Sequence, residues 1–126
     1  MKLHPDQSNV QTITSYGAGW IAVDGERIDH SVIISSDGQR IDWNCQQFSD
    51  LDASHFARLA ELDTELVIFG SGSKIRFPKP VWLQPLMQRR LGLETMDSHA
   101  ACRTYNILAG EGRKVAVAVL IEDPPM

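Results

Sequence analysis

Two stretches of the sequence combine residue types that could bind a ligand or carry out chemistry. One is the turn at residues 70–73, which directly follows the apolar run at residues 66–69, and the other is residues 98–103. A short apolar run ended by glycine is typical of a strand buried on both faces, and ligands of wound α/β sheets lie beyond the carboxyl ends of such strands. We therefore predict a binding cleft without catalytic residues, whose candidate members are Gly70, Ser71, Gly72, Ser73, Ser98, His99, Cys102 and Arg103.

The glycines and the expected helix start bear on which ligand this cleft could hold. Backbone N–H groups of a helix that begins near Ser98, together with the charge of Arg103, favour an anion. A dinucleotide fingerprint would need a third glycine where the chain has Ile75, and a Walker A motif would need a Gly-Lys-Ser or Gly-Lys-Thr sequence that this turn lacks. The sequence therefore favours a role for Gly70 and Gly72 in turning and packing over phosphate binding.

His99 and Cys102 are three positions apart, which places them on one face of a helix. Such a pair is half of a metal site or a nucleophile with its base. The further metal ligands, or an orienting carboxylate with an oxyanion hole, are missing from the pattern. Because Cys102 follows Ala100 and Ala101, we predict a small buried hydrophobe rather than a reactive thiol. No metal and no cofactor are predicted.

Composition and charge restrict the class of protein and its partners. The chain has 126 residues, 43% of them apolar and 22% charged, which predicts one globular domain over residues 1–126 with a polar, flexible arm at residues 1–10. The net charge of −4 argues against nucleic acid as a partner. Four cations are expected to form a solvated basic face around one helix: Arg76, Lys79, Arg89 and Arg90.

Several features predict a cytoplasmic location. The longest apolar run, residues 115–121, is too short to span a bilayer, so no integral membrane segment is expected. The two cysteines, Cys45 and Cys102, have no CxxC spacing, which argues against a disulfide framework. The first ten residues resemble neither a signal peptide nor a transit sequence.

The elements that must position the cleft change character along the chain. Residues 10–15, 20–23, 27–35 and 39–44 have strand patterns, and Asp24-Gly25 is a strong signal for a type I′ turn. This third of the chain is therefore predicted to be an antiparallel β-meander.

The remaining chain alternates between helix and strand. Helices are predicted over residues 53–61, 81–91 and 100–109, the last two closed by Gly92 and Gly110. Strands are predicted over residues 66–69, 93–96 and 113–122. The expected fold is thus α/β, a three-layer domain with a mixed sheet, an N-terminal antiparallel meander that extends it, and a C-terminal αβαβαβ unit.

Two segments together resemble a known family. They are LVIFGSG at residues 66–72 and AACRTYNILAGEGRKVA at residues 100–116. The sequence resembles a small domain family of bacteria, archaea and mitochondria, whose mitochondrial members are assembly factor 3 of respiratory complex I. The resemblance implies a three-layer α/β fold on a mixed sheet and no established catalytic activity. Because the chain lacks the N-terminal targeting extension of the mitochondrial members, it implies a bacterial cytoplasmic protein.

Two functions follow as hypotheses. The first, implied by the resemblance, is a non-enzymatic protein-binding or assembly module whose partners include respiratory complex I subunits. The alternative is a small enzyme or a protein that binds an anionic ligand between residues 70–73 and residues 98–103.

Overall fold

The apolar run at residues 66–69 forms an interior strand of a mixed sheet, as its pattern predicts. The computed structural model describes residues 10–122, so the predicted arm lies outside the described residues except for Val10. The strand is β6 (Leu66–Gly70), and Val67, Ile68 and Phe69 are inaccessible to solvent. Both faces of this strand are therefore covered.

The mixed sheet has five strands in the order β5-β4-β8-β6-β7. In this sheet β6 is parallel to β7 (Gly92–Met96) and to β8 (Val115–Val119). Strand β4 (Val32–Ser35) is antiparallel to β8 and to β5 (Arg40–Asp42). The predicted α/β fold class with a mixed sheet is confirmed.

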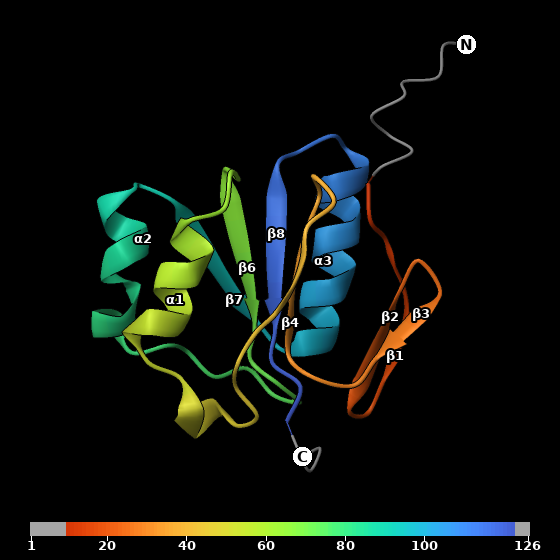
Figure 1. Ribbon diagram of the computed structural model, residues 1–126, viewed down its shortest axis with the longest axis horizontal. Coiled ribbons are helices and arrows are strands. Elements are labelled where there is room, and N and C mark those ends of the chain that lie inside the picture. Colours follow the sequence, from red (N-terminus) through yellow and green to blue (C-terminus); the bar gives the residue numbers. More distant parts are fainter. Residues whose placement is uncertain (1–9, 123–126) are drawn as a thin grey trace.

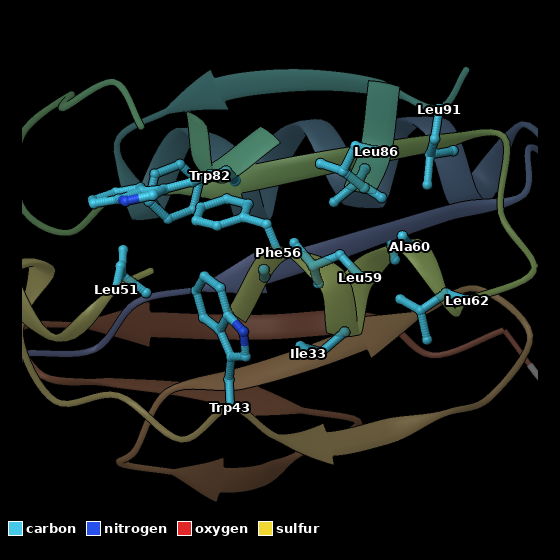
Figure 2. Packing of buried hydrophobic residues seen from close by; sticks show 14 of the residues in the cluster. Ile33, Trp43, Leu51, Phe56, Leu59, Ala60, Leu62, Trp82, Leu86 and Leu91 are labelled. Atoms are coloured by element: carbon cyan, nitrogen blue, oxygen red, sulfur yellow. The ribbon is translucent and has the colours of Figure 1, made fainter. Parts of the chain in front are cut away.

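One face of the sheet packs on an aromatic cluster beneath two helices. Helix α1 (Ala53–Ala60) begins at its cap Asp52, and α2 (Gln84–Gln88) follows a 3₁₀ turn at Pro80–Leu83. The centre of the Phe56 ring lies 5.4 Å from that of Phe69 and 5.9 Å from that of Trp82. Figure 2 shows Phe56 and Trp82 side by side in this cluster. Strand β8 presents Ala116 and Ala118 to this cluster. The alanines are small, which leaves room for the large rings above the sheet.

The other face of the sheet is covered by α3 (Ser98–Gly110), which is itself covered by a second sheet (Figure 1). This second sheet is antiparallel and consists of β1 (Ile13–Gly17), β2 (Trp20–Val23) and β3 (Glu26–Ile28). The Tyr105 hydroxyl donates to the Gln11 carbonyl at 2.8 Å, and the Asn106 side chain bonds both backbone groups of Ile13. Helix α3 is therefore held on two opposite sides.

The predicted strand over residues 27–35 is wrong, because it is divided between the two sheets. Strand β3 ends at Ile28 in the outer sheet, and β4 begins at Val32 in the mixed sheet. The link turns at Ser31, whose hydroxyl accepts a hydrogen bond from the Ile121 amide at 2.8 Å. Since the two sheets lie on opposite sides of α3, one continuous strand could not serve both. The Asp24-Gly25 turn is confirmed, with φ of 50° and 85°.

Two predicted helix ends are also wrong. The helix expected over residues 81–91 begins as the 3₁₀ turn, and Pro85 lies in the first turn of α2, where its missing N–H is not required. The left-handed residue after α2 is Arg90 rather than Gly92, and α3 continues through Gly110 to a left-handed Gly112. Gly92 is free to begin β7 instead. The 3₁₀ turn Phe48–Asp50 precedes α1.

Candidate functional site

The two predicted turns lie side by side, as expected for parallel strands that end at the same edge of a sheet. Gly70 of β6 is paired with Met96 of β7. The Ser98 amide donates to the Gly72 carbonyl at 2.8 Å, and the Gly72 amide donates to Ser98 Oγ at 2.8 Å. Ser98 Oγ also donates to the Leu120 carbonyl at 3.0 Å. Ser98 follows β7, and its buried hydroxyl bonds residues that follow β6 and β8. It thus joins the ends of these three strands.

The glycines of this turn serve packing and backbone geometry. A Cβ atom at Gly70 would lie 3.0 Å from both the Ala101 Cβ and the Ser98 Cα. Gly72 has φ of +106°, and a Cβ there would lie 2.5 Å from a guanidinium nitrogen of Arg76. Both contacts are closer than ordinary side chains make, so neither position leaves space for a side chain. This geometry agrees with the packing role favoured by the sequence.

A cavity of about 210 Å³ opens beside the two turns. It lies where the β1–β2 turn, the end of β8 and the start of α3 meet. Four of the predicted site residues line it: Gly72, Ser73, Ser98 and His99. The remaining lining residues are Gly17, Ala18, Gly19, Trp20, Ile21, Asp97, Val119, Leu120, Ile121 and Glu122. The outer sheet therefore supplies a wall that the sequence did not predict.

The other four predicted residues do not line this cavity. Gly70 lies beneath Ser98, and Ser71 is buried with its hydroxyl 2.8 Å from the Lys74 carbonyl. Cys102 is buried on the inner side of α3. Arg103 is exposed and donates to the Tyr16 hydroxyl at 2.8 Å. The expected positive charge is therefore directed at the outer sheet rather than into the cavity.

The electrostatics of the cavity differ from those of an anion site. Asp97 caps α3 by accepting from the Ala100 amide at 2.9 Å, and the Ser98 amide is already bonded to Gly72. Asp97 and Glu122 bring two carboxylates to the lining, which contains no lysine or arginine. The N–H groups of Ser98 and Ala100 are thus occupied, and Asp97 adds negative charge at the start of α3, whereas the charge of Glu122 is compensated by Arg76.

His99 holds the start of α3 against the outer sheet. Its Nε2 lies 3.2 Å from the Gly17 carbonyl, and its ring lies 4.4 Å from that of Tyr16. Burial raises the pKa of the Cys102 thiol to about 12, which argues against a nucleophile–base pair with His99. Within residues 10–122, no group of three His, Cys, Asp or Glu side chains could hold a metal ion.

We expect replacement of Cys102 by serine to destabilise the protein by about 1–3 kcal/mol, because the hydroxyl would be buried among apolar groups without a partner. Burial also raises the pKa of the Cys45 thiol to about 12, but Ser31 lies beside it as a hydrogen-bond partner. Cys45→Ser is therefore the matched control, with a smaller expected loss. Urea unfolding measures both changes.

The thiol chemistry gives a second measurement of the same prediction. Alkylation of native Cys102 at neutral pH should be much slower than that of a free thiol; faster alkylation would show that the residue is reactive.

Since both folded thiols stay protonated to a higher pH than unfolded thiols, the unfolded chain loses its thiol protons first as the pH rises. The thiols' contribution to stability should therefore be present at neutral pH and decline as the pH rises above about 8.5.

The sequence also missed an ion pair beneath the turn. Arg76 Nη2 lies 2.5 Å from Glu122 Oε1 and 2.7 Å from the Ser71 carbonyl, and its guanidinium lies over the Phe48 ring. The expectation that Arg76 belongs to a solvated face is therefore wrong. Arg89 likewise donates to the Ala60 carbonyl. Glu122 follows directly on the apolar run at residues 115–121, which is the signal in the sequence for a partly buried carboxylate, but its pairing depends on the fold.

Comparison with curated proteins finds relatives of known name. The chain is 31% identical over 114 residues to mouse "NADH dehydrogenase [ubiquinone] 1 alpha subcomplex assembly factor 3". The match covers 89% of this chain and 60% of the mouse protein, so the chain spans about three fifths of this relative.

Within residues 10–122, no helix is long and apolar enough to cross a membrane.

Solved structures with the same fold come from two Bordetella species. A crystal structure of a Bordetella parapertussis protein has a TM-score of 0.84 at 36% identity, over 90% of this chain and 97% of that one. A solution structure from Bordetella pertussis, described as an Mth938-like domain, has a TM-score of 0.79 at 35% identity, over 97% and 93% of the two chains. The model of a protein family of unknown function, DUF498/DUF598, matches residues 13–120. The chain therefore belongs to the DUF498/DUF598 family, to which it is matched along nearly all of its described length.

Proposed function

We propose that this protein is a non-enzymatic binding or assembly module that recognises a protein partner at the cavity beside residues 70–73. The observation that carries the proposal is the construction of the cavity wall. Ser98 bonds Gly72 and Leu120, and His99 bonds the β1–β2 turn at Gly17, so segments from both sheets are held in fixed positions. A wall of this kind is preorganised for binding a protein partner. Its hydroxyl and imidazole groups are already held by hydrogen bonds, so binding does not have to order them.

The size of the cavity supports a protein partner. Pockets for small molecules are usually about 300–1,000 Å³, and the present cavity is about 210 Å³. This volume suits one side chain projecting from a partner. Trp20 and Ile21 offer apolar contacts, and Asp97 favours an apolar or cationic side chain over an acidic one.

The curated relatives suggest which partners to test. The mouse relative is named as an assembly factor for NADH dehydrogenase. We therefore propose that the partners include subunits of the corresponding respiratory enzyme, and that the protein acts on them from the cytoplasm.

Affinity capture from a native lysate tests this function. We expect the wild-type protein to recover subunits of the respiratory NADH dehydrogenase, and Ser73→Trp, which fills the cavity from an exposed position, to lose them. Glu111→Trp is the matched control, because Glu111 follows the opposite end of α3. Failure of the wild-type protein to recover these subunits, or their full retention by Ser73→Trp, would contradict the proposal.

A small ligand in the same cavity is the second candidate. Its position beyond the carboxyl ends of parallel strands favours this function. The Asp97 carboxylate favours a neutral or cationic ligand over the anionic one expected from the sequence. A thermal-shift screen tests this second function. An unfolding temperature that rises with amines, and not with phosphates, would support a small ligand.

A further inference from the structure

Most of the large apolar side chains that remain exposed lie in one segment. Five such side chains are exposed among the described residues, and four of them belong to residues 74–90, which comprise the link after β6, the 3₁₀ turn, α2 and its end. They are Ile75 at 50% exposure, Phe77 at 70%, Val81 at 58% and Met87 at 68%. The fifth, Ile107, lies on α3, on the other face of the mixed sheet.

The charge of this segment is opposite to that of the whole protein. The chain has a net charge of −4, yet no acidic residue occurs between Glu65 and Glu94. Arg76 and Arg89 are bonded within the fold. The other three cations of the segment, Lys74, Lys79 and Arg90, form no ion pair with any described residue.

Two buried residues of the segment fix it to the core. Trp82 and Leu86 point into the aromatic cluster near Phe56 (Figure 2), whereas their neighbours Val81 and Met87 are exposed. The exposed apolar groups are therefore a second, outward set rather than part of the core. Exposed apolar groups bordered by charge indicate a contact with a protein or a membrane.

We propose that residues 74–90 dock on the surface of an anionic phospholipid bilayer. The exposed apolar side chains of the link, Ile75 and Phe77, lie between the two exposed cations Lys74 and Lys79. A bilayer interface accepts such side chains individually, whereas a protein partner would need a matching pocket for each. Lys74, Lys79 and Arg90, which form no ion pair with a described residue, attract anionic headgroups. The segment contains no acidic residue that would repel these headgroups.

Sedimentation with phospholipid vesicles tests this proposal with the full chain. We expect vesicles that contain phosphatidylglycerol to bind the protein, pure phosphatidylcholine vesicles to bind it far more weakly, and high salt to release it. Phe77→Ser should weaken binding about tenfold or more. Lys74→Gln with Lys79→Gln should weaken it about 25-fold, since each cation near an anionic surface contributes about fivefold.

Two control variants separate docking by this segment from general adhesion. Ile107→Ser removes a comparably exposed apolar side chain elsewhere, and Lys114→Gln removes an exposed cation beside Asp63. Both should bind vesicles like the wild-type protein. Absence of binding to anionic vesicles, or equal losses in the controls and in Phe77→Ser, would overturn the proposal. Loss of a protein partner by Phe77→Ser without any vesicle binding would instead assign the segment to an acidic protein.

Discussion

Replacement of Gly72 by valine is expected to destabilise the protein by at least about 3 kcal/mol. Two effects add. The backbone at Gly72 has φ of +106°, which a β-branched residue rarely adopts. The new Cβ would also lie 2.5 Å from Arg76 Nη2 and 2.8 Å from Glu122 Oε1, so the buried ion pair would have to separate. Urea unfolding measures the total loss.

Gly112→Val separates these two effects. Gly112 also has a left-handed backbone, with φ of +85°, but no atom lies within 4 Å of a Cβ placed there. It should therefore cost only the backbone strain, about 1–2 kcal/mol. Equal losses in the two variants would mean that the contacts with Arg76 and Glu122 contribute little. In NMR spectra, Gly72→Val should shift Ser98 and leave the Asp24-Gly25 turn unchanged.

Replacement of Arg76 by alanine is expected to destabilise the protein by about 3 kcal/mol. The Glu122 side chain is 5% exposed and that of Arg76 is 25% exposed. Without the guanidinium, the contact that residues 10–122 leave to the carboxylate is a long one, 3.4 Å from the Phe48 amide. A buried charge that loses its partner costs far more than the net contribution of the pair. The free energy of unfolding in urea measures this loss.

The pair between Arg113 and Glu65 provides the control for Arg76→Ala. Its N–O distance of 2.7 Å is similar, but the two side chains are 47% and 52% exposed. Arg113→Ala should therefore cost less than about 1 kcal/mol. In the double variant Arg76→Ala/Glu122→Gln, part of the stability should return, because no charge would be left without a partner. A loss in Arg76→Ala no larger than in Arg113→Ala would show that the buried pair is not important.

The elements whose signals are local can be predicted from the sequence. The apolar run of β6, the helix around Phe56 and the Asp24-Gly25 turn depend on patterns within a few residues, and the structure contains all three. The approach of Gly72 to Ser98 was also predictable, because parallel strands must end at the same edge of a sheet. The buried state of Cys102 followed from its small neighbours.

Features that depend on partners distant in the chain could not be predicted in this way. The alternation at residues 27–35 could not show that Ile28 and Val32 belong to sheets on opposite sides of α3. The charge of Arg76 predicted a solvated side chain, and only folding brings Glu122 against it. The cavity wall at Gly17 likewise comes from the outer sheet. Local patterns report backbone preference and the need for burial, whereas the partner that satisfies a buried group is set by the packing of the whole chain.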